Sequence, residues 1–243
     1  MNAEHLSRRL SVIAQEIPYQ VRMADIGTDH GYLPVYLVKH GKVEWALASD
    51  VNESPLNSAV EKIKREGLEK YIETRVGPGL AVIKEEDNID TAVIAGMGGS
   101  LISSILEDGK NSLKNIKRLV LQPNVGAVQI RKWMMRNNWQ IINEHIIEED
   151  EHIYEILIAE PGDPYLPYQT LGMSEEAGQL FGPYLIKKQP SAFIKKWKRE
   201  KESWQYVLQE IEKASERGAV LSKKKELMKK LSLLEEVFKN ETS

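Results

Sequence analysis

Between residues 21 and 160, short runs rich in Val, Ile and Ala alternate with longer segments whose apolar residues recur every three or four positions. The short runs predict buried strands, and the longer spacing predicts amphipathic helices. Strands that alternate with helices pair in parallel and are covered by helices on both faces. The expected strands span 21–26, 44–50, 71–76, 90–95, 117–122, 139–149 and 152–160.

Helices are expected before and between these strands, over residues 4–16, 33–40, 55–67, 99–107 and 125–137. The last two strands follow each other closely and are joined at acidic residues, so they form an antiparallel hairpin. The pattern therefore predicts an α/β fold with a Rossmann-like sheet of seven strands, the last one antiparallel. An NAD-binding Rossmann domain usually lacks such a terminal hairpin.

A second part of the chain follows the Pro- and Gly-rich segment 161–168, which is typical of a linker. Residues 174–181 predict a short helix. Two long amphipathic patterns, at 191–217 and 219–239, are separated by Gly218. Two such helices predict an antiparallel, coiled-coil-like hairpin whose aromatic end packs on another element.

The charge of the chain is divided unevenly. Residues 1–183 hold 18 Lys and Arg against 27 Asp and Glu, whereas residues 184–243 hold 15 against 9. We therefore expect two domains with different tasks, an acidic α/β domain over 1–162 and a basic helical hairpin domain over 163–243. The alternative is that the lysines of the hairpin are simply solvated.

Several classes of protein are excluded or disfavoured by composition. The 243 residues contain no cysteine, which excludes disulfides and thiolate metal sites, and the five histidines form no pair at metal-ligand spacing, so no metal is expected. No run of about 18 apolar residues predicts a membrane span. The N-terminus carries charge throughout and does not resemble a signal peptide. A cytoplasmic protein is expected.

The first strand ends in a turn with two carboxylates, Asp25 and Asp29, around Gly27. A glycine turn before a helix usually binds phosphate, but these aspartates would repel a diphosphate. A ligand with a positive centre and an amino group fits better, and S-adenosylmethionine carries both. Gly27 permits close approach to the backbone. The alternative is an acidic turn in which Asp29 or Thr28 caps the helix.

The second and third strands end in further candidate cofactor residues. Asp50 ends the second strand, where a carboxylate accepts both ribose hydroxyls of an adenine nucleoside, with Val51 and Asn52 beside it. The sequence Gly77-Pro78-Gly79-Leu80 follows the third strand, where a loop would pass the adenine ring. Pro78 offers no side-chain acceptor and no N–H, so backbone groups and Leu80 would have to recognise adenine.

The fourth and fifth strands contribute Gly96-Met97-Gly98 and Gln122-Pro123-Asn124. Small residues after the fourth strand let a cofactor and a substrate approach the backbone. An amide from Gln122 or Asn124 can pair with the edge of a base, although a plain turn explains this segment equally well.

The segments DIGTDHGYLP, ASDVN, GPGL, IAGMGG and LQPN, followed by a basic helical hairpin, resemble the bacterial tRNA (adenine-22-N1)-methyltransferases, which use S-adenosylmethionine. The resemblance spans the whole chain. It implies a Rossmann-like catalytic domain and methylation of N1 of an adenine in the D-loop region of tRNA. Such a base must be unpaired or rotated out of its helix.

The predicted site residues fall into three groups. For the cofactor they are Asp25, Gly27, His30, Tyr32, Leu33, Asp50, Val51, Asn52, Gly77, Gly79, Leu80, Gly96, Met97 and Gly98. For catalysis they are Asp29, whose charge would stabilise the cationic product, and Asn124. For tRNA phosphates they are Arg8, Arg9, Lys195, Lys196, Lys198, Arg199, Lys201, Lys223, Lys224 and Lys225.

Three other functions remain open from the residues themselves. The chain could methylate another RNA, a protein or a small molecule, with the hairpin serving dimerisation. It could be a nucleotide-binding oxidoreductase, although the acidic turn and the missing third glycine disfavour this. It could also be a non-catalytic S-adenosylmethionine sensor. A monomer or weak dimer is expected.

Overall fold

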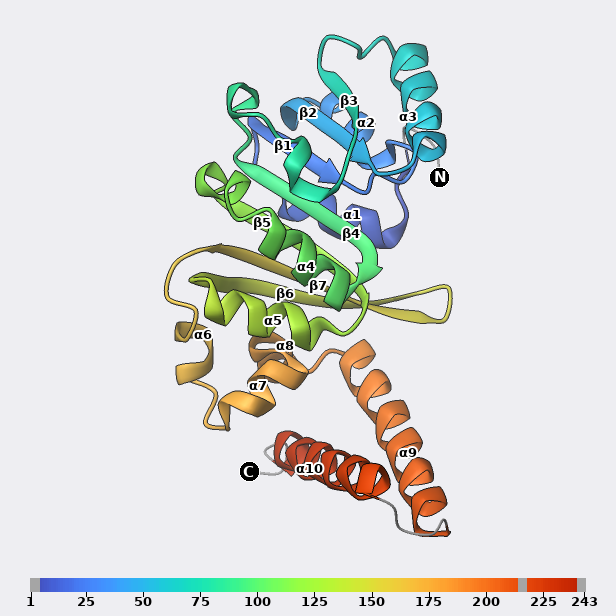
Figure 1. The fold of residues 1–243 in the computed structure, drawn as a ribbon, viewed down its shortest axis with the longest axis vertical. Coiled ribbons are helices and arrows are strands. Elements are labelled where there is room, and N and C mark those ends of the chain that lie inside the picture. The colour runs from blue at the N-terminus through green and yellow to red at the C-terminus, as the bar shows by residue number, and fades with distance from the viewer. Residues whose placement is uncertain (1–4, 214–217, 240–243) are drawn as a thin grey trace. The chain divides into compact units, whose positions relative to one another are not determined.

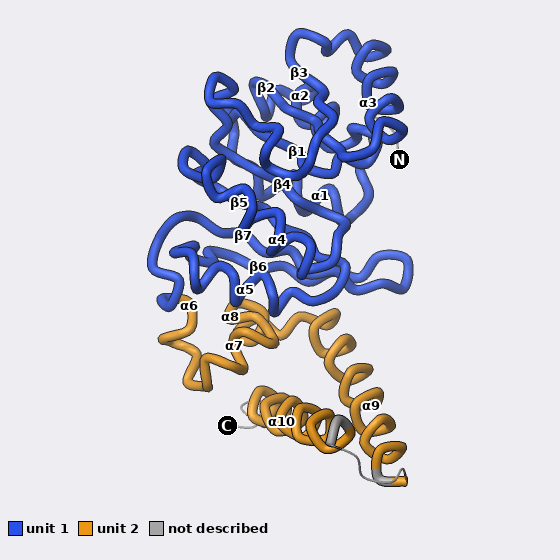
Figure 2. The backbone as a smooth tube through the Cα atoms, viewed as in Figure 1, with its two compact units in different colours: residues 1–166 blue, residues 167–243 orange. Residues whose placement is uncertain are grey.

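The computed structural model describes residues 5–213 and 218–239. The chain divides into two compact units, residues 1–166 and 167–243 (Figure 2). The division falls a few residues after the predicted one, because a short helix, α6 (Leu166–Gln169), replaces the end of the expected linker. Within the described ranges, no helix has both the length and the apolar character that crossing a membrane requires.

Unit 1 is built on a seven-stranded sheet in the order β3-β2-β1-β4-β5-β7-β6 (Figure 1). Strands β1 to β5 pair in parallel, and β7 is antiparallel to both β5 and β6. The seven-stranded Rossmann-like sheet is therefore confirmed. The strands are β1 Val21–Ile26, β2 Val43–Asp50, β3 Ile72–Val76, β4 Thr91–Gly98, β5 Arg118–Val125, β6 Trp139–Glu149 and β7 His152–Pro161.

Helices cover both faces of this sheet. Helices α1, α2 and α3 contact one another on one face, and α4 and α5 pack together on the other. These helices are α1 Arg8–Glu16, α2 Tyr32–Lys39, α3 Glu53–Glu66, α4 Gly99–Asp108 and α5 Ala127–Arg136. The described residues also form short 3₁₀ helices that the sequence pattern does not predict: η1 Gly79–Val82, η2 Glu85–Asp87 and η3 Ser112–Asn115. Tight turns of this length have no apolar period that a sequence pattern could reveal.

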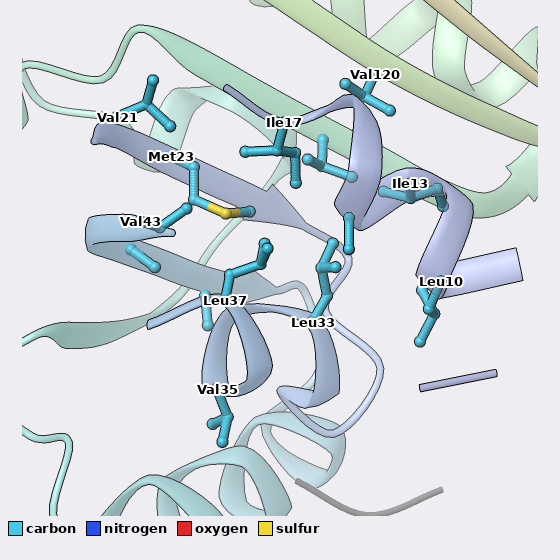
Figure 3. Packing of buried hydrophobic residues seen from close by; sticks show 14 of the residues in the cluster. Leu10, Ile13, Ile17, Val21, Met23, Leu33, Val35, Leu37, Val43 and Val120 are labelled. Atoms are coloured by element: carbon cyan, nitrogen blue, oxygen red, sulfur yellow. The ribbon is translucent and has the colours of Figure 1, made fainter. Parts of the chain in front are cut away.

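A hydrophobic core cluster lies between the sheet and helices α1 and α2 (Figure 3). Leu10 and Ile13 of α1 meet Leu33 and Leu37 of α2 over the strand residue Met23, and all five side chains are buried. Burying a Leu, Ile or Met side chain contributes about 1.5–3 kcal/mol each. This packing holds the ends of β1 and β2, and with them the site, in place.

Helix α1, near the start of the chain, is bound to the terminal hairpin of unit 1. It begins at Arg8, later than the predicted residue 4, because Ser7 caps it by accepting a hydrogen bond from the Leu10 N–H at 3.3 Å. At its start, Arg8 donates to the carbonyl of Glu148 at 3.2 Å. At its end, Glu16 contacts His145 at 2.5 Å. The first helix is therefore bound to a strand that lies more than a hundred residues later.

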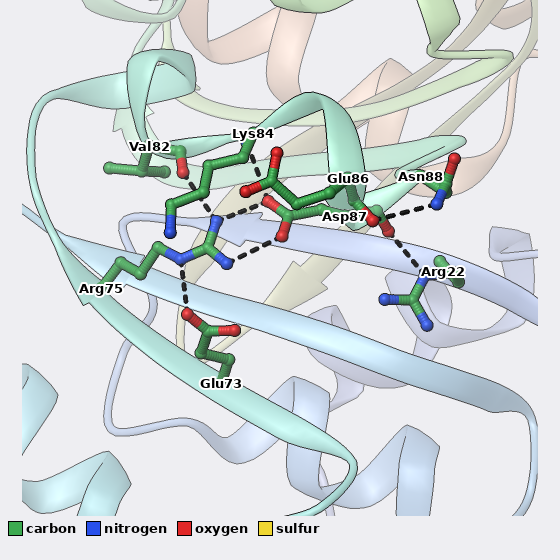
Figure 4. Close-up of polar contacts among 8 residues, drawn as sticks. All are labelled: Arg22, Glu73, Arg75, Val82, Lys84, Glu86, Asp87 and Asn88. Carbon is green, nitrogen blue, oxygen red and sulfur yellow. Dashed lines mark hydrogen bonds and ion pairs between the residues drawn. The ribbon is translucent and has the colours of Figure 1, made fainter.

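The loop between β3 and β4 is ordered by a charged network (Figure 4). Arg75 of β3 donates twice to Asp87, at 2.7 Å through Nη2 and also through Nη1, and donates to the Val82 carbonyl at 2.9 Å. Arg22 of β1 donates to the Asp87 carbonyl at 2.6 Å. Burial acts to raise the pKa of Asp87, but the hydrogen bonds from Arg75 and Lys84 outweigh it and hold that pKa below its usual value.

A buried ion network joins α5 to the terminal hairpin. Arg131 is fully buried, donates to Glu144 of β6 at 2.7 Å and donates to Glu155 of β7. Both glutamates are themselves buried. Helical periodicity places α5 correctly but cannot reveal that a charged residue on it points inward.

Unit 2 contains α7 Glu175–Phe181, α8 Pro183–Lys188, α9 Ser191–Lys213 and α10 Gly218–Lys239. Helix α8 is not predicted by the sequence pattern, and the predicted extension of the first long helix over 214–217 lies outside the described residues. The ring centroids of Phe193 and Phe238 lie 6.4 Å apart, and the Lys230 amine lies 5.8 Å from the Trp204 ring. The first contact joins the start of α9 to the end of α10, and the second joins their middle turns, as in an antiparallel pair. The coiled-coil character stays a prediction.

Candidate cofactor and substrate site

A cavity of about 370 Å³ lies at the carboxyl ends of β1, β2, β4 and β5. Strand order reverses here, with β2 on one side of β1 and β4 on the other, which is where open α/β sheets bind ligands. The lining residues are Arg9, Leu10, Asp25, Gly27, Asp29, Leu33, Asp50, Ala95, Gly96, Met97, Asn124 and Tyr154.

The turn after β1 gives the cavity its most buried carboxylate. Asp25 is 6% exposed, and its Oδ2 accepts a hydrogen bond from the Thr28 hydroxyl at 2.7 Å. The N–H groups of Gly27 and Thr28 both donate to the Ser49 carbonyl at 2.8 Å, which fixes the turn against β2. Gly27 has φ +75°, and an added Cβ would lie 2.0 Å from the end of Met97. The backbone angle favours glycine here, whereas the Met97 methyl group ends a flexible side chain that can move aside.

The charge of Asp25 is disfavoured in the ligand-free protein. Burial raises its pKa to about 6, the Thr28 hydrogen bond and the Arg9 charge oppose this rise, and the charges of Asp29 and Asp50 add to it. Because Asp25, Asp29 and Asp50 all line this cavity, a cationic ligand would reduce the repulsion between their charges and stabilise the ionised form of Asp25. A perturbed carboxyl in a cleft is a common mark of a functional site.

Asp29 and His30 lie at the open side of the turn. The Asp29 carboxylate lies 3.4 Å from His30 Nε2, and both side chains are about half exposed. Asp29 does not cap α2, because the capping position is Gly31 and no side chain bonds to the helix start. The carboxylate lines the cavity and contacts His30, so it is not a helix cap, and its catalytic role stays a prediction.

Helix α3 supports this turn from behind. Lys62 is buried, donates to the His30 carbonyl at 2.8 Å and lies 2.9 Å from the centre of the Tyr32 ring. Burial lowers the pKa of Lys62 to about 8, assisted by Arg65, while Asp29 opposes the shift. Tyr32 therefore contacts Lys62 and does not line the cavity.

Gly31 should be intolerant of a side chain, because it has φ +65° and an added Cβ would lie 2.9 Å from Ala59 Cβ on α3. We expect Gly31→Ala to lower the free energy of unfolding by about 2–3 kcal/mol, from backbone strain and overpacking together. Gly41→Ala is the matched control, because Gly41 has φ +64° with no atom within 4 Å. Urea unfolding should show that Gly41→Ala lowers the free energy of unfolding by only about 1 kcal/mol. Equal losses in both variants would contradict the packing role of α3.

Asp50 closes the cavity at the end of β2. Its Oδ1 accepts the N–H of Asn52 at 2.8 Å, and its backbone carbonyl accepts the N–H of Gly77 at 3.0 Å. The first bond orients the carboxylate, and the second ties the loop after β3 to the site. Asn52 stands before α3 without a side-chain cap bond, and Val51 is exposed.

Strands β4 and β5 extend further than predicted, through Gly98 and Val125. Gly96 is the extra residue of a bulge, since Ala95 pairs with Gln122 and Met97 with Pro123. The Gly96 N–H donates to Gln122 Oε1 at 3.1 Å, and its carbonyl accepts from Asn124 Nδ2 at 2.8 Å. The side chains of Gln122 and Asn124 on β5 thus bond the backbone groups of Gly96 that the bulge leaves without strand partners. Both β4 and β5 can therefore continue as strands past Gly96 and Pro123.

Arg9 enters the cavity from the first turn of α1. Its guanidinium donates to Gln122 Oε1 and lies 5.4 Å from the centre of the Tyr154 ring. The structure shows that Arg9 lines the cavity. Its contact with tRNA phosphates stays a prediction. Leu10, Ala95 and Tyr154 also line the cavity without being predicted. Tyr154 is on β7, which lies beside β5 in the sheet, and a sequence pattern does not reveal this neighbour.

The other predicted cofactor residues do not line this cavity: His30, Tyr32, Val51, Asn52, Gly77, Gly79, Leu80 and Gly98. Leu80 is buried in η1, beside Gly109. Arg8 donates to the hairpin backbone. Within residues 5–213 and 218–239, no cluster of three or more His, Asp or Glu side chains could hold a metal ion.

The sheet order, the antiparallel β7 and an acidic cavity at the switch point define a Rossmann-like methyltransferase. The family model for tRNA (adenine(22)-N(1))-methyltransferase matches residues 23–236. The chain belongs to this family.

Similar proteins cover nearly the whole chain. The tRNA (adenine(22)-N(1))-methyltransferase of Bacillus subtilis is 43% identical over 238 residues, which is 98% of this chain and 99% of that protein. A crystal structure of the B. subtilis m1A22 tRNA methyltransferase matches with a TM-score of 0.91 over 96% of this chain and 98% of that one. A Streptococcus pneumoniae protein in complex with S-adenosyl-L-methionine is 35% identical, with a TM-score of 0.83 over 96% and 99%.

Proposed function

We propose that this chain transfers a methyl group from S-adenosylmethionine to N1 of adenine 22 in tRNA. The observation that carries the proposal is the family match over residues 23–236, joined to a cavity whose three carboxylates suit a cationic nucleoside. A diphosphate cofactor would meet Asp25, Asp29 and Asp50 with repulsion.

The residues of the cavity fit S-adenosylmethionine in chemical type. When bound, this cofactor supplies a methyl group on a positively charged sulfur. Asp25 would accept from its ammonium group, Asp50 would accept from its ribose hydroxyls, and Gly27 lets the ligand approach the backbone. Leu33 and Met97 would exclude water along the apolar parts.

Asp29 and Asn124 are the proposed substrate residues. The methylated adenine is cationic, so the exposed Asp29 carboxylate would stabilise the charge that develops on the ring. Asn124 offers an amide to the edge of the base. In-line transfer depends on alignment, so much of the rate would come from holding the base against the methyl group.

The direct test is methyl transfer to undermodified tRNA with labelled S-adenosylmethionine, followed by mass spectrometry of the nucleosides. We expect 1-methyladenosine at position 22, and no transfer after ribonuclease treatment. Transfer that survives ribonuclease, or a different modified nucleoside, would contradict the proposal.

The basic face of α9 is proposed to hold the tRNA backbone. Lys195, Lys198 and Arg199 are exposed and share one helix face. We expect reversal of all three to Glu to weaken tRNA binding and to reduce the salt dependence by roughly 0.7–0.9 in the log–log slope for each phosphate that is no longer neutralised. Filter binding at several salt concentrations measures both quantities.

The matched control reverses three exposed lysines of unit 1, Lys64, Lys70 and Lys114, which changes the net charge equally. If both triple variants lose the same affinity, only total charge matters and α9 has no specific role. On α10, Lys223 already pairs with Glu226 at 3.1 Å, so it should contribute less than Lys225.

We propose that the enzyme acts in the cytoplasm, on the grounds of its proposed tRNA substrate. We propose a monomer or weak dimer, which sedimentation over a range of protein concentrations would test.

A further inference from the structure

The bulge at Gly96 closes a ring of three hydrogen bonds that has one allowed direction. The Gly96 N–H can only donate and meets Gln122 Oε1, and the Gly96 carbonyl can only accept and meets Asn124 Nδ2. Gln122 Nε2 then donates to Asn124 Oδ1 at 3.2 Å. Each amide must present a particular atom to each neighbour, so both are held in one of their two flip states.

Arg9 gives a second, independent reason for this orientation of the Gln122 amide. Its guanidinium has no acceptor, so the atom of Gln122 that it contacts must also be the oxygen. Gln122 is fully buried, which makes an unmade hydrogen bond there costly. Gln122 Oε1 therefore accepts from both Arg9 and the Gly96 N–H, and the amide nitrogen on the other side of the group faces Asn124.

Asn124 is the exposed member of the ring and lines the cavity. The ring uses one of its two N–H groups and one of the two lone pairs on its oxygen. We infer that Gln122 is a positioning residue that orients the Asn124 carboxamide so that its oxygen accepts the amino group of the target adenine. This inference rests on the proposed function.

The chemistry indicates which kinetic constant should change. As adenine N1 forms its bond to the methyl carbon, the carbon–sulfur bond breaks and its electron pair stays on sulfur, which becomes neutral. The positive charge passes to the purine ring and is shared with the amino group. That group becomes a stronger donor, so a fixed acceptor at Asn124 stabilises the transition state more than the bound substrate.

The test is Gln122→Glu, which keeps the acceptor for Arg9 and Gly96 but replaces the donor toward Asn124 with an oxygen. We expect kcat for tRNA methylation to fall roughly tenfold to hundredfold, with KM for S-adenosylmethionine within about twofold and an unchanged or higher melting temperature. Gln129→Glu, the same change on the exposed start of α5, is the control and should match the wild type.

Two further measurements decide the inference. Nitrogen-15 NMR of the ligand-free protein should show slow exchange of an Asn124 side-chain amide proton, and Gln122→Glu should abolish it. The second measurement uses a tRNA in which purine, which lacks the amino group, replaces the target adenine. This change should lower kcat of the wild type but should not lower kcat of Gln122→Glu any further. Retained kcat, retained protection or additive losses would each overturn the inference. A wild type that does not methylate tRNA would instead defeat the proposed function, and the NMR result would still judge the ring.

Discussion

Asp25→Asn should make the ligand-free protein more stable at pH 8 and nearly unable to bind S-adenosylmethionine. The pKa of Asp25 is raised from 3.8 to about 6 by burial. Ionising it in the folded protein therefore costs about 3 kcal/mol, and Asn removes this cost. The amide oxygen can still accept from Thr28. Removing a buried protein carboxylate that pairs with a cationic ligand should weaken binding of that ligand roughly hundredfold.

The sign of the pH dependence follows from the same shift. Between about pH 4 and 6 the folded wild type holds a proton on Asp25 that the unfolded chain has released, so stability falls as pH rises through this window. Asp25→Asn should remove that fall. Bound cofactor favours the charged form, so the wild-type Kd should rise about tenfold for each pH unit below 6.

Urea unfolding and calorimetry across pH 4–8 measure these effects. The control is Asp108→Asn at the exposed end of α4, where Asp108 accepts a hydrogen bond from the Ser104 hydroxyl at 3.3 Å. It should change neither stability nor cofactor affinity. If Asp25→Asn destabilises the protein at pH 8, or binds the cofactor as tightly as the wild type, the cavity does not act through a buried carboxylate.

Arg131→Met should have the largest effect on stability. Methionine fills a similar space, but Glu144 and Glu155 would lose the buried cation between them. Breaking a buried pair in this way costs about 3–5 kcal/mol, because uncompensated charge remains. Chemical unfolding followed by circular dichroism at pH 7 measures the loss.

Two companions keep this prediction open to contradiction. Lys132→Met changes the exposed neighbour on the same helix and should alter stability by no more than about 0.5 kcal/mol. Replacing Glu144 and Glu155 with Leu in the Arg131→Met background removes the stranded charges and should restore much of the loss. A single variant within about 1 kcal/mol of the wild type would show that the network does little for folding.

The sequence predicts the sheet well because its strands are apolar runs that helical segments separate. It also predicts that Asp25, Gly27 and Asp50 lie together, because they stand where strands end and parallel strands end at one edge. It fails at Gly96 and Pro123, which normally interrupt strands. There, side chains of β5 satisfy the backbone, which is a tertiary effect without a local pattern.

The remaining differences also concern partners that are distant in sequence. The inward direction of Arg131 depends on two glutamates on other elements, and the position of Tyr154 depends on β7 lying beside β5. The sequence alone indicates a surface cation at Arg9, because its contacts with Gln122 and Tyr154 cross more than a hundred residues. Local periodicity reports which face of an element is apolar and not what that face meets.

The attachment of α1 to the terminal hairpin has a consequence for biosynthesis. During translation, Arg8 and Glu16 leave the ribosome long before Glu148 and His145 are made. The apolar face of the emerging first helix can pack on β1 and α2 soon after they are made, but the contacts of Arg8 and Glu16 cannot form until the last hairpin is complete. In nascent chains, the two ends of α1 should therefore become protected from limited proteolysis only once the ribosome has passed the segment that encodes β7.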